Sequence, residues 1–388
     1  MMTRNNKPRR SLVAAGVFAA GLPAIALAGP SIQFGEQGYI SVNYALQIWA
    51  QQQDFTSSGD DGDQTDFFLR RNRLTFTGQY NDYVGFYAQL EAGSDSKDGL
   101  DDREVFYRDA YVTLDYSDAM RLIAGRFKQT FSRENLEACL EPLTLDRSDI
   151  SFTPFGGTRD TGVALWGNLA DGAFQYRFMA ADGRENDDVV TDSPRLTARV
   201  HWSPLEPEYD YGYRGTYLGT RTVFTVGVSY DTQADVAYGN FTTRSDVKDY
   251  EATTADVFVE YPTSLGTFTA SAAAFDYSVG DAINDDPDPS LPATTELEGY
   301  YVKGGYLLPD KVGPGRLQIF ARHDEADYNL SDGTLDNNRT GVGFNYYLDG
   351  QKLKFTGEYM TVDFDVDHPL SAALRDHEQV TLGFQMIF

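Results

Sequence analysis

The last nine residues, 380–388, read VTLGFQMIF and place an apolar side chain at every second position. Those side chains are Val380, Leu382, Phe384, Met386 and Phe388. A period of two predicts a β-strand with two unlike faces. No residue follows Phe388 in the sequence, so the apolar face of this strand needs cover from another strand, another layer or lipid.

The first 28 residues are predicted to be a secretory signal peptide. Four basic residues and no acidic one lie within positions 1–10, and an apolar run follows from Leu12 to the small-residue pattern Ala26-Leu27-Ala28. This is the pattern of a cleaved secretory signal. A buried helix or a membrane anchor is the alternative, but the run is short and contains Gly21 and Pro23. We therefore expect one mature domain, residues 29–388, that works outside the cytoplasm.

The charge and cysteine content exclude several classes of protein. The chain has 32 basic and 58 acidic residues, and loss of the four basic residues of the signal leaves a net charge of −30. Nucleic acid and anionic lipid surfaces are poor partners for such a chain. The single cysteine, Cys139, excludes an internal disulfide. The 14% of aromatic residues is too high for a disordered chain.

Alternating polarity recurs along the whole mature chain. No later stretch approaches the roughly 20 apolar residues of a membrane helix, so a membrane-spanning form would be a β-barrel. The alternation predicts sixteen strands, an even number that suits a bacterial barrel. They cover residues 35–52, 65–80, 83–93, 104–117, 120–128, 159–168, 173–182, 194–203, 220–231, 250–262, 265–276, 297–308, 315–324, 338–348, 351–362 and 377–388.

The connections between these strands fall into two alternating classes. Short ones include Asn81-Asp82, Asp118-Ala119 and Asp349-Gly350. The long ones cover residues 53–64, 94–103, 129–158, 183–193, 232–249, 277–296, 325–337 and 363–376. Short periplasmic turns opposite long external loops give this pattern. One connection breaks it, because residues 204–219, which should form a short turn, are long and rich in tyrosine.

A soluble β-sandwich or a secreted β-helix would also alternate. Sandwich strands are shorter, and their apolar faces cover one another. The longer strands, the signal peptide and the aromatic strand ends favour a closed barrel in which lipid covers the outer face. The last strand would then lie beside the first, with Phe388 on the lipid face.

Three motifs resemble a known family. They are FFLRRNRLTFTGQYNDYVGFYAQLE at 67–91, YRDAYVTLDYSDAMRLIAGRFKQTFSRENL at 107–136 and DRSDISFTPFGGTRDTGVALW at 146–166. Together they resemble the phosphate-selective porin O/P family of Gram-negative outer membranes. The resemblance implies a homotrimeric outer-membrane channel of sixteen strands, whose third loop folds into the pore and whose lumen carries basic residues. The terminal Phe388 is similar to the end sequence by which the barrel-assembly machinery recognises such proteins.

The residues themselves predict a basic inner wall, since charges are costly on lipid and tolerated in a wet lumen. The parity that turns Leu74 outward turns Arg71 and Arg73 inward. The predicted lumen residues of the strands are Arg71, Arg73, Asp109, Arg177, Arg195, Arg199, Lys303, Arg316, Arg322 and Lys354. For each of them an ion-paired or solvated role is the alternative to guiding anions. Arg70 does not fit the parity, and a β-bulge or a subunit interface would account for it.

The longest loop, residues 129–158, is expected to fold inward as a constriction loop. Lys128, Arg133 and Arg147 are placed to meet passing anions. Several carboxylates accompany them, and no regular series of lysines leads to a phosphate site. The sequence therefore leaves two channels open, one that prefers phosphate or other small anions and a general or weakly cation-selective porin for small organic solutes.

Other functions have less support. The barrel could serve as an adhesin or as a sleeve around an electron-transfer partner. The long third loop favours a channel instead, because a sleeve would need a wide, unobstructed bore. No serine hydrolase or zinc hydrolase motif occurs, so an enzyme is not expected, nor is a cofactor. The external loops carry many acidic residues, which would contact lipopolysaccharide through divalent cations without forming a dedicated metal site. They include Asp54, Asp60, Asp61, Asp63, Glu185, Asp187, Asp188, Asp281, Asp285, Asp286, Asp288, Asp324, Glu325, Asp327, Asp363, Asp365 and Asp367.

Overall fold

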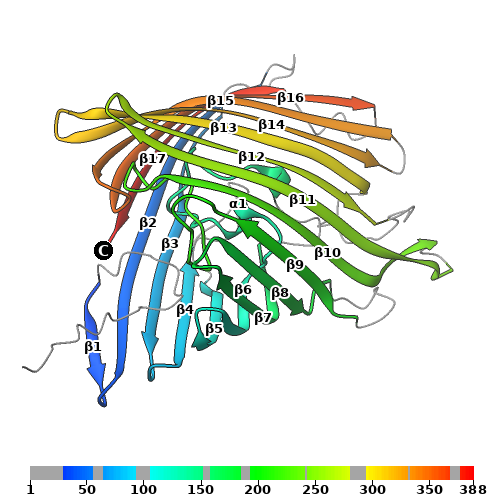
Figure 1. Ribbon diagram of the computed structural model, residues 1–388. Helices are drawn as coiled ribbons and strands as arrows, with labels where there is room; N and C mark the ends of the chain where they lie inside the picture. The colour runs from blue at the N-terminus through cyan, green and yellow to red at the C-terminus, as the bar shows by residue number, and fades with distance from the viewer. Residues whose placement is uncertain are drawn as a thin grey trace, which may run out of the picture.

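The computed structural model describes residues 29–55, 64–92, 105–151, 158–184, 193–240, 243–279, 294–330, 333–367 and 376–388. The predicted signal peptide, residues 1–28, lies outside these ranges. Within them the chain is almost entirely β-structure (Figure 1). No helix of the described residues is long and apolar enough to cross a membrane.

Seventeen strands are present in the described ranges. They are β1 (Ser31–Phe34), β2 (Gly38–Phe55), β3 (Gln64–Gln79), β4 (Val84–Ala92), β5 (Val105–Ser117), β6 (Met120–Lys128), β7 (Arg159–Leu169), β8 (Phe174–Ala181), β9 (Arg195–Trp202), β10 (Val223–Asn240), β11 (Ser245–Thr263), β12 (Gly266–Ser278), β13 (Thr294–Val312), β14 (Gly315–Leu330), β15 (Gly333–Asp349), β16 (Leu353–Asp367) and β17 (His377–Ile387). A short helix, α1 (Arg133–Leu136), and a 3-10 turn (Asp149–Ser151) lie between β6 and β7.

The strands β2 to β17 close into one antiparallel barrel. Each pairs with the next strand in the chain, and β17 also pairs with β2, with Phe384 opposite Ile48. The predicted all-β, sixteen-stranded antiparallel barrel is therefore confirmed. The extra strand, β1, forms a hairpin with β2 through a turn at Gly35, whose φ of 61° favours glycine.

The predicted alternation of faces is also confirmed. Ser41, Asn43 and Gln47 of β2 are buried inside, whereas Ile48 is exposed on the outer wall. At the other end of the chain, Phe344 and Phe388 are exposed on the outside. The outer face therefore presents apolar side chains to its surroundings, as a wall in contact with lipid requires.

Several strands are longer than the sequence predicts. The expected loops 232–249 and 325–337 are mainly strand, because β10 continues to Asn240 and β14 continues to Leu330. Their polar residues still form the backbone ladder, as in the pair Asp327↔Asp336, and this ladder does not depend on an apolar side chain. The acidic residues Asp324, Glu325, Asp327, Asp363, Asp365 and Asp367 therefore lie in β14 and β16, and Asp54 lies in β2, instead of in loops. The other acidic loop residues named above lie outside the described ranges.

Two connections pack against the inner wall. The first joins β6 to β7, and its Phe131 and Ile150 pack against Tyr250, Phe275 and Tyr301. The second joins β9 to β10 and contains the tyrosine-rich stretch 204–219. Because three antiparallel strands separate β6 from β10, these connections start from opposite ends of the barrel. Both contribute to one apolar cluster, which unites Leu136, Tyr211 and Tyr213 with Phe127 and Trp166 of the wall.

Candidate functional site

A β-bulge in β3 turns two adjacent arginines to the inside of the barrel. Gln47 pairs with Arg71 and Ile48 pairs with Leu69, so Arg70 is an extra residue in the ladder. Arg71 and Arg70 both reach Asp146 of the β6–β7 connection, with Nη2–carboxylate distances of 2.9 and 2.6 Å. The bulge accounts for Arg70, the residue that did not fit the predicted parity, and it removes the alternative that this side chain lies at a subunit interface.

Asp146 is held as a carboxylate by these arginines. Burial alone would raise the pKa of this carboxyl group, but the guanidiniums of Arg70, Arg71 and Arg147 hold the pKa well below its ordinary value. The main-chain N–H of Arg147 also donates to Asp146 Oδ1 at 2.9 Å. This cluster ties the β6–β7 connection to β3.

A second bulge, in β5, has the same effect on a neighbouring pair. Gln89 pairs with Asp109 and Leu90 pairs with Tyr107, which leaves Arg108 as the extra residue. Arg108 and Asp109 are both buried. Arg108 donates to Glu91 at 2.6 Å, and Arg73 donates to the same carboxylate at 2.7 Å. One carboxylate thus serves two guanidiniums of the inner wall.

Most of the predicted lumen cations have carboxylate partners. Arg195 is paired with Asp231, Arg199 with Asp256, Lys303 with Glu134 and Arg322 with Asp324. Asp109, the predicted lumen acid, accepts two hydrogen bonds from Arg159. Truncating either member of such a buried pair would leave an uncompensated charge. These arginines therefore stabilise the wall as well as lining it.

Four predicted cations have no carboxylate within ion-pair distance among the described residues. Lys128 donates to the main-chain oxygen of Glu137, and Arg177 donates to Gln175 Oε1 at 2.8 Å. Arg316 donates to the oxygen of Leu218 at 3.0 Å, and Lys354 donates to Gln351 Oε1 at 2.9 Å. Each of these four groups is therefore bonded to a neutral acceptor and not to a carboxylate.

Arg133 connects the two internal segments. Its guanidinium donates to Glu208 of the β9–β10 connection at 2.6 and 2.8 Å, and it lies over the rings of Tyr213 and Phe258. The main chains of the two segments are also bonded, since the N–H of Ala138 donates to the oxygen of Tyr213 at 2.9 Å. The long 204–219 connection is therefore an internal structural element, which the strand pattern alone did not explain.

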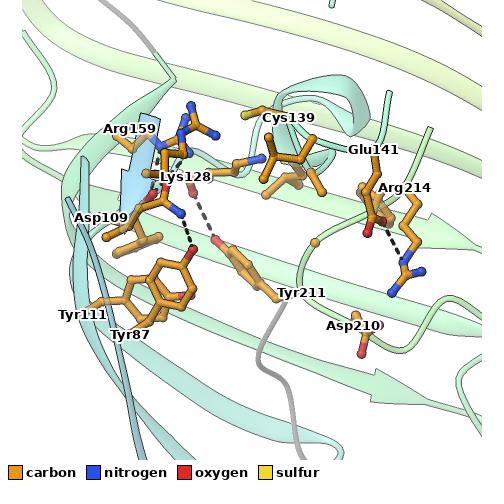
Figure 2. Close-up of a pocket in the computed structure, with 18 of the residues that line it drawn as sticks. Tyr87, Asp109, Tyr111, Lys128, Cys139, Glu141, Arg159, Asp210, Tyr211 and Arg214 are labelled. Atoms are coloured by element: carbon orange, nitrogen blue, oxygen red, sulfur yellow. Dashed lines mark hydrogen bonds and ion pairs between the residues drawn. The ribbon is translucent and has the colours of Figure 1, made fainter. Parts of the chain in front are cut away.

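A cavity lies between the wall of β3–β7 and the two internal segments (Figure 2). The space between its lining residues measures about 840 Å³, a volume that includes open solvent. Figure 2 shows Arg159, Lys128 and Asp109 gathered on one side, with Glu141, Arg214 and Asp210 on the other. Arg214 and Glu141 form an ion pair at 3.1 Å. Tyr87, Tyr111 and Tyr211 form much of the remaining lining.

Gly125 makes room for this tyrosine lining. It pairs with Tyr111 across β5 and β6 and has a φ of 129°. A Cβ at this position would lie 2.3 Å from the oxygen of Ala110 and 2.8 Å from the Cα of Tyr111. The absence of a side chain lets the Tyr111 ring lie close to the wall, where it stacks on Tyr87 with 5.1 Å between ring centroids.

The model of the family described as phosphate-selective porin O and P matches residues 42–388. The chain belongs to this porin family. A protein of Aquifex aeolicus strain VF5 that is described as uncharacterized is 22% identical over 348 residues, covering 80% of this chain and 78% of that protein. The family and the closed barrel establish an outer-membrane channel.

Solved porins share the fold. An anion-selective porin from Comamonas acidovorans is 11% identical, covers 91% of this porin and 100% of its own chain, and has a TM-score of 0.58. The trimer form of the outer membrane protein OmpT from Vibrio cholerae is 11% identical with the same coverage and a TM-score of 0.54. At these identities the likeness concerns the barrel and not its selectivity.

Sequence reasoning missed several residues of the site. Arg108 and Arg159 were not among the predicted lumen residues, and Glu208 had no assigned partner. An adjacent pair of charged residues within a strand was the available signal for both bulges, as in Arg70-Arg71 and Arg108-Asp109. Among the described residues, no group of three or more histidine, cysteine or acidic side chains is arranged to hold a metal ion.

Proposed function

We propose that this porin is a diffusion channel with a preference for small anions, phosphate among them. The observation that carries the proposal is Lys128, whose ammonium group lines the cavity and bonds to a main-chain oxygen instead of a carboxylate. Arg73 and Arg159 line the same cavity. Fixed charges in a narrow passage are less screened than acidic residues at the rim, where the Debye length is about 8 Å at physiological salt. The lumen cations then outweigh the negative net charge of the chain.

The β6–β7 connection, residues 129–158, is proposed to be the constriction. Its buried helix α1 and its contacts with β3, β13 and β14 support this role. A bore occupied by two internal segments does not suit a sleeve around a protein partner. Deletion of residues 130–157 should increase single-channel conductance, and unchanged conductance would count against the constriction.

Ion pairing supports a second candidate, a general or weakly cation-selective porin for small organic solutes. Arg73 shares Glu91 with Arg108, and Arg159 is bound to Asp109, so these cations are partly neutralised. Reversal potentials in a potassium chloride gradient across a planar bilayer separate the two candidates. An anion-selective potential is expected. A cation-selective potential that Arg71→Ala and Arg73→Ala leave unaltered would favour the general porin.

The assembly is proposed to be a homotrimer joined through the outer walls of the first and last strands. The trimer form of the Vibrio cholerae protein supports this, as does the apolar outer wall, where Leu382 of β17 is exposed. Native electrophoresis after gentle extraction should show a trimer, and a monomer alone would contradict it.

Two further partners are proposed. The exposed terminal Phe388 supports recognition by the barrel-assembly machinery. Acidic residues near the long connections support contact with lipopolysaccharide through divalent cations.

A further inference from the structure

We propose that the cavity is a binding site for aromatic carboxylates, so that the preferred permeants include flat organic anions as well as inorganic ones. This inference rests on the proposed anion preference and specifies its substrate class. It follows from the combination of an aromatic lining, further apolar side chains in the same cavity and one cation without a carboxylate partner.

The aromatic lining comes from four elements that are separate in the sequence. Tyr87 of β4 and Tyr111 of β5 stack with an interplanar angle of 9°. Phe127 of β6 meets Tyr111 edge-on with 6.2 Å between centroids, and Tyr211 of the β9–β10 connection meets Phe127 in the same way at 6.4 Å. Edge-to-face and stacked contacts at these distances are the arrangements that aromatic rings favour. A flat ligand ring would extend the same pattern.

Part of the remaining lining is apolar. Leu136 and Leu140 of the β6–β7 connection and Ile387 of β17 line the cavity, and all three are buried. These side chains provide no hydrogen-bond donors to replace the water that a phosphate dianion would lose on entering. An organic anion with an apolar body would gain free energy by burying that body against these side chains, whereas inorganic phosphate has no apolar surface to bury.

The carboxylate of the ligand would bind at Lys128. The Tyr211 hydroxyl donates to the main-chain oxygen of Lys128 at 3.2 Å, which holds an aromatic ring beside this residue. Arg159, on the same side of the cavity in Figure 2, is already bound through Nε and Nη2 to Asp109 at 3.2 Å. Lys128 is therefore the cation of the cavity that is available for a new anion. The same positive charge disfavours an aromatic ligand that is itself a cation.

The test is block of single-channel chloride current by benzoate, acetate and inorganic phosphate, each added to the intact porin in a planar bilayer. Benzoate is expected to reach half-block at a concentration roughly ten-fold or more below those of acetate and phosphate, because its ring binds the aromatic lining. Equal half-blocking concentrations for benzoate and acetate would overturn the aromatic site. That result would leave the anion preference intact, because the reversal potential measures the preference independently.

Two variants and their matched controls locate the site. Lys128→Gln and Tyr211→Leu should each raise the half-blocking concentration of benzoate, and Tyr211→Leu should leave that of acetate nearly unchanged. The controls are Lys311→Gln, an exposed lysine at the end of β13, and Tyr209→Leu, whose exposed side chain bonds to the oxygen of Asp171. If the controls weaken benzoate block as much as the site variants, the proposal is wrong. If a variant does not assemble, the half-blocking concentrations of benzoate and acetate on the unchanged porin still test the aromatic site.

Discussion

Arg133 and Glu208 join two connections that start from opposite ends of the barrel. The guanidinium donates to both carboxylate oxygens at 2.6 and 2.8 Å, and both side chains are almost completely buried. Glu208 also accepts hydrogen bonds from the hydroxyls of Tyr217 and Thr225, each at 2.6 Å. The shape of the lumen therefore depends on a contact between the β6–β7 and β9–β10 connections as well as on the wall.

Glu208→Gln should destabilise the barrel by up to about 3–5 kcal/mol, because the buried guanidinium of Arg133 loses its bidentate carboxylate partner. It keeps only the longer contact with Glu137, at 3.6 Å. The matched control is Glu206→Gln on the same connection, whose pair with Arg221 is 3.8 Å long and partly exposed. Its expected cost is about 0–1 kcal/mol. Urea unfolding of the porin in lipid vesicles, followed by tryptophan fluorescence, measures both. Similar costs for the two variants would show that the Arg133–Glu208 contact does not hold the connections together.

Phe344→Arg tests the lipid-facing wall. Phe344 lies in the apolar band of β15 and is exposed on the outer face. A charge near the middle of the bilayer should cost about 2–4 kcal/mol, whereas Tyr80→Arg, at the short-turn end of β3, should cost about 0–1 kcal/mol. The same unfolding assay applies. If both substitutions were tolerated equally, Phe344 would not face the hydrocarbon core.

The barrel could be predicted because each strand has one face toward lipid and the other toward the lumen. Apolar side chains therefore recur at every second position of a strand. Residues such as Phe344 and Phe388 carry that period in the sequence. The site was less predictable because its residues break the period. Bulges direct Arg70 and Arg108 inward. Each bulge is stabilised by an ion pair of its extra arginine, with Asp146 for Arg70 and with Glu91 for Arg108. An ion pair between residues as distant in the sequence as Arg133 and Glu208 produces no local sequence pattern, so it could not be predicted.

Asp146→Asn should increase the anion preference. The carboxylate is the shared partner of Arg70 and Arg71, so its removal leaves net positive charge on the inner wall. The control is Asp149→Asn, in which a half-exposed carboxylate paired with Arg339 is lost from the same connection. Reversal potentials in a potassium chloride gradient should move toward the chloride equilibrium potential for Asp146→Asn and much less for Asp149→Asn. An unchanged reversal potential for Asp146→Asn would show that these arginines do not act on permeating ions, and a shift in the opposite direction would also contradict the prediction.

The anion preference should also increase as the pH falls from about 7.5 to about 5. Carboxyl groups of the two connections that are buried or partly buried take up protons at a higher pH than ordinary carboxyl groups do. Burial raises the pKa of Glu141 and Asp210 above the ordinary values of 4.5 and 3.8, although Arg214 opposes the shift in both. Burial likewise raises the pKa of Glu137 to about 7 against the opposing effect of Arg133.

The sign follows from which charges remain. An acid with a raised pKa is neutral at a higher pH than an ordinary carboxyl group, so negative charge is lost from the two connections while the arginines stay protonated. The folded state then binds more protons than the unfolded chain, so the stability contributed by these groups also increases as the pH falls through this window. Reversal potentials at several pH values measure the first effect. A variant with both Glu137→Gln and Glu141→Gln should lose most of the pH dependence, and Glu206→Gln should retain it. A pH dependence that the double variant keeps in full would place the titrating groups elsewhere in the porin.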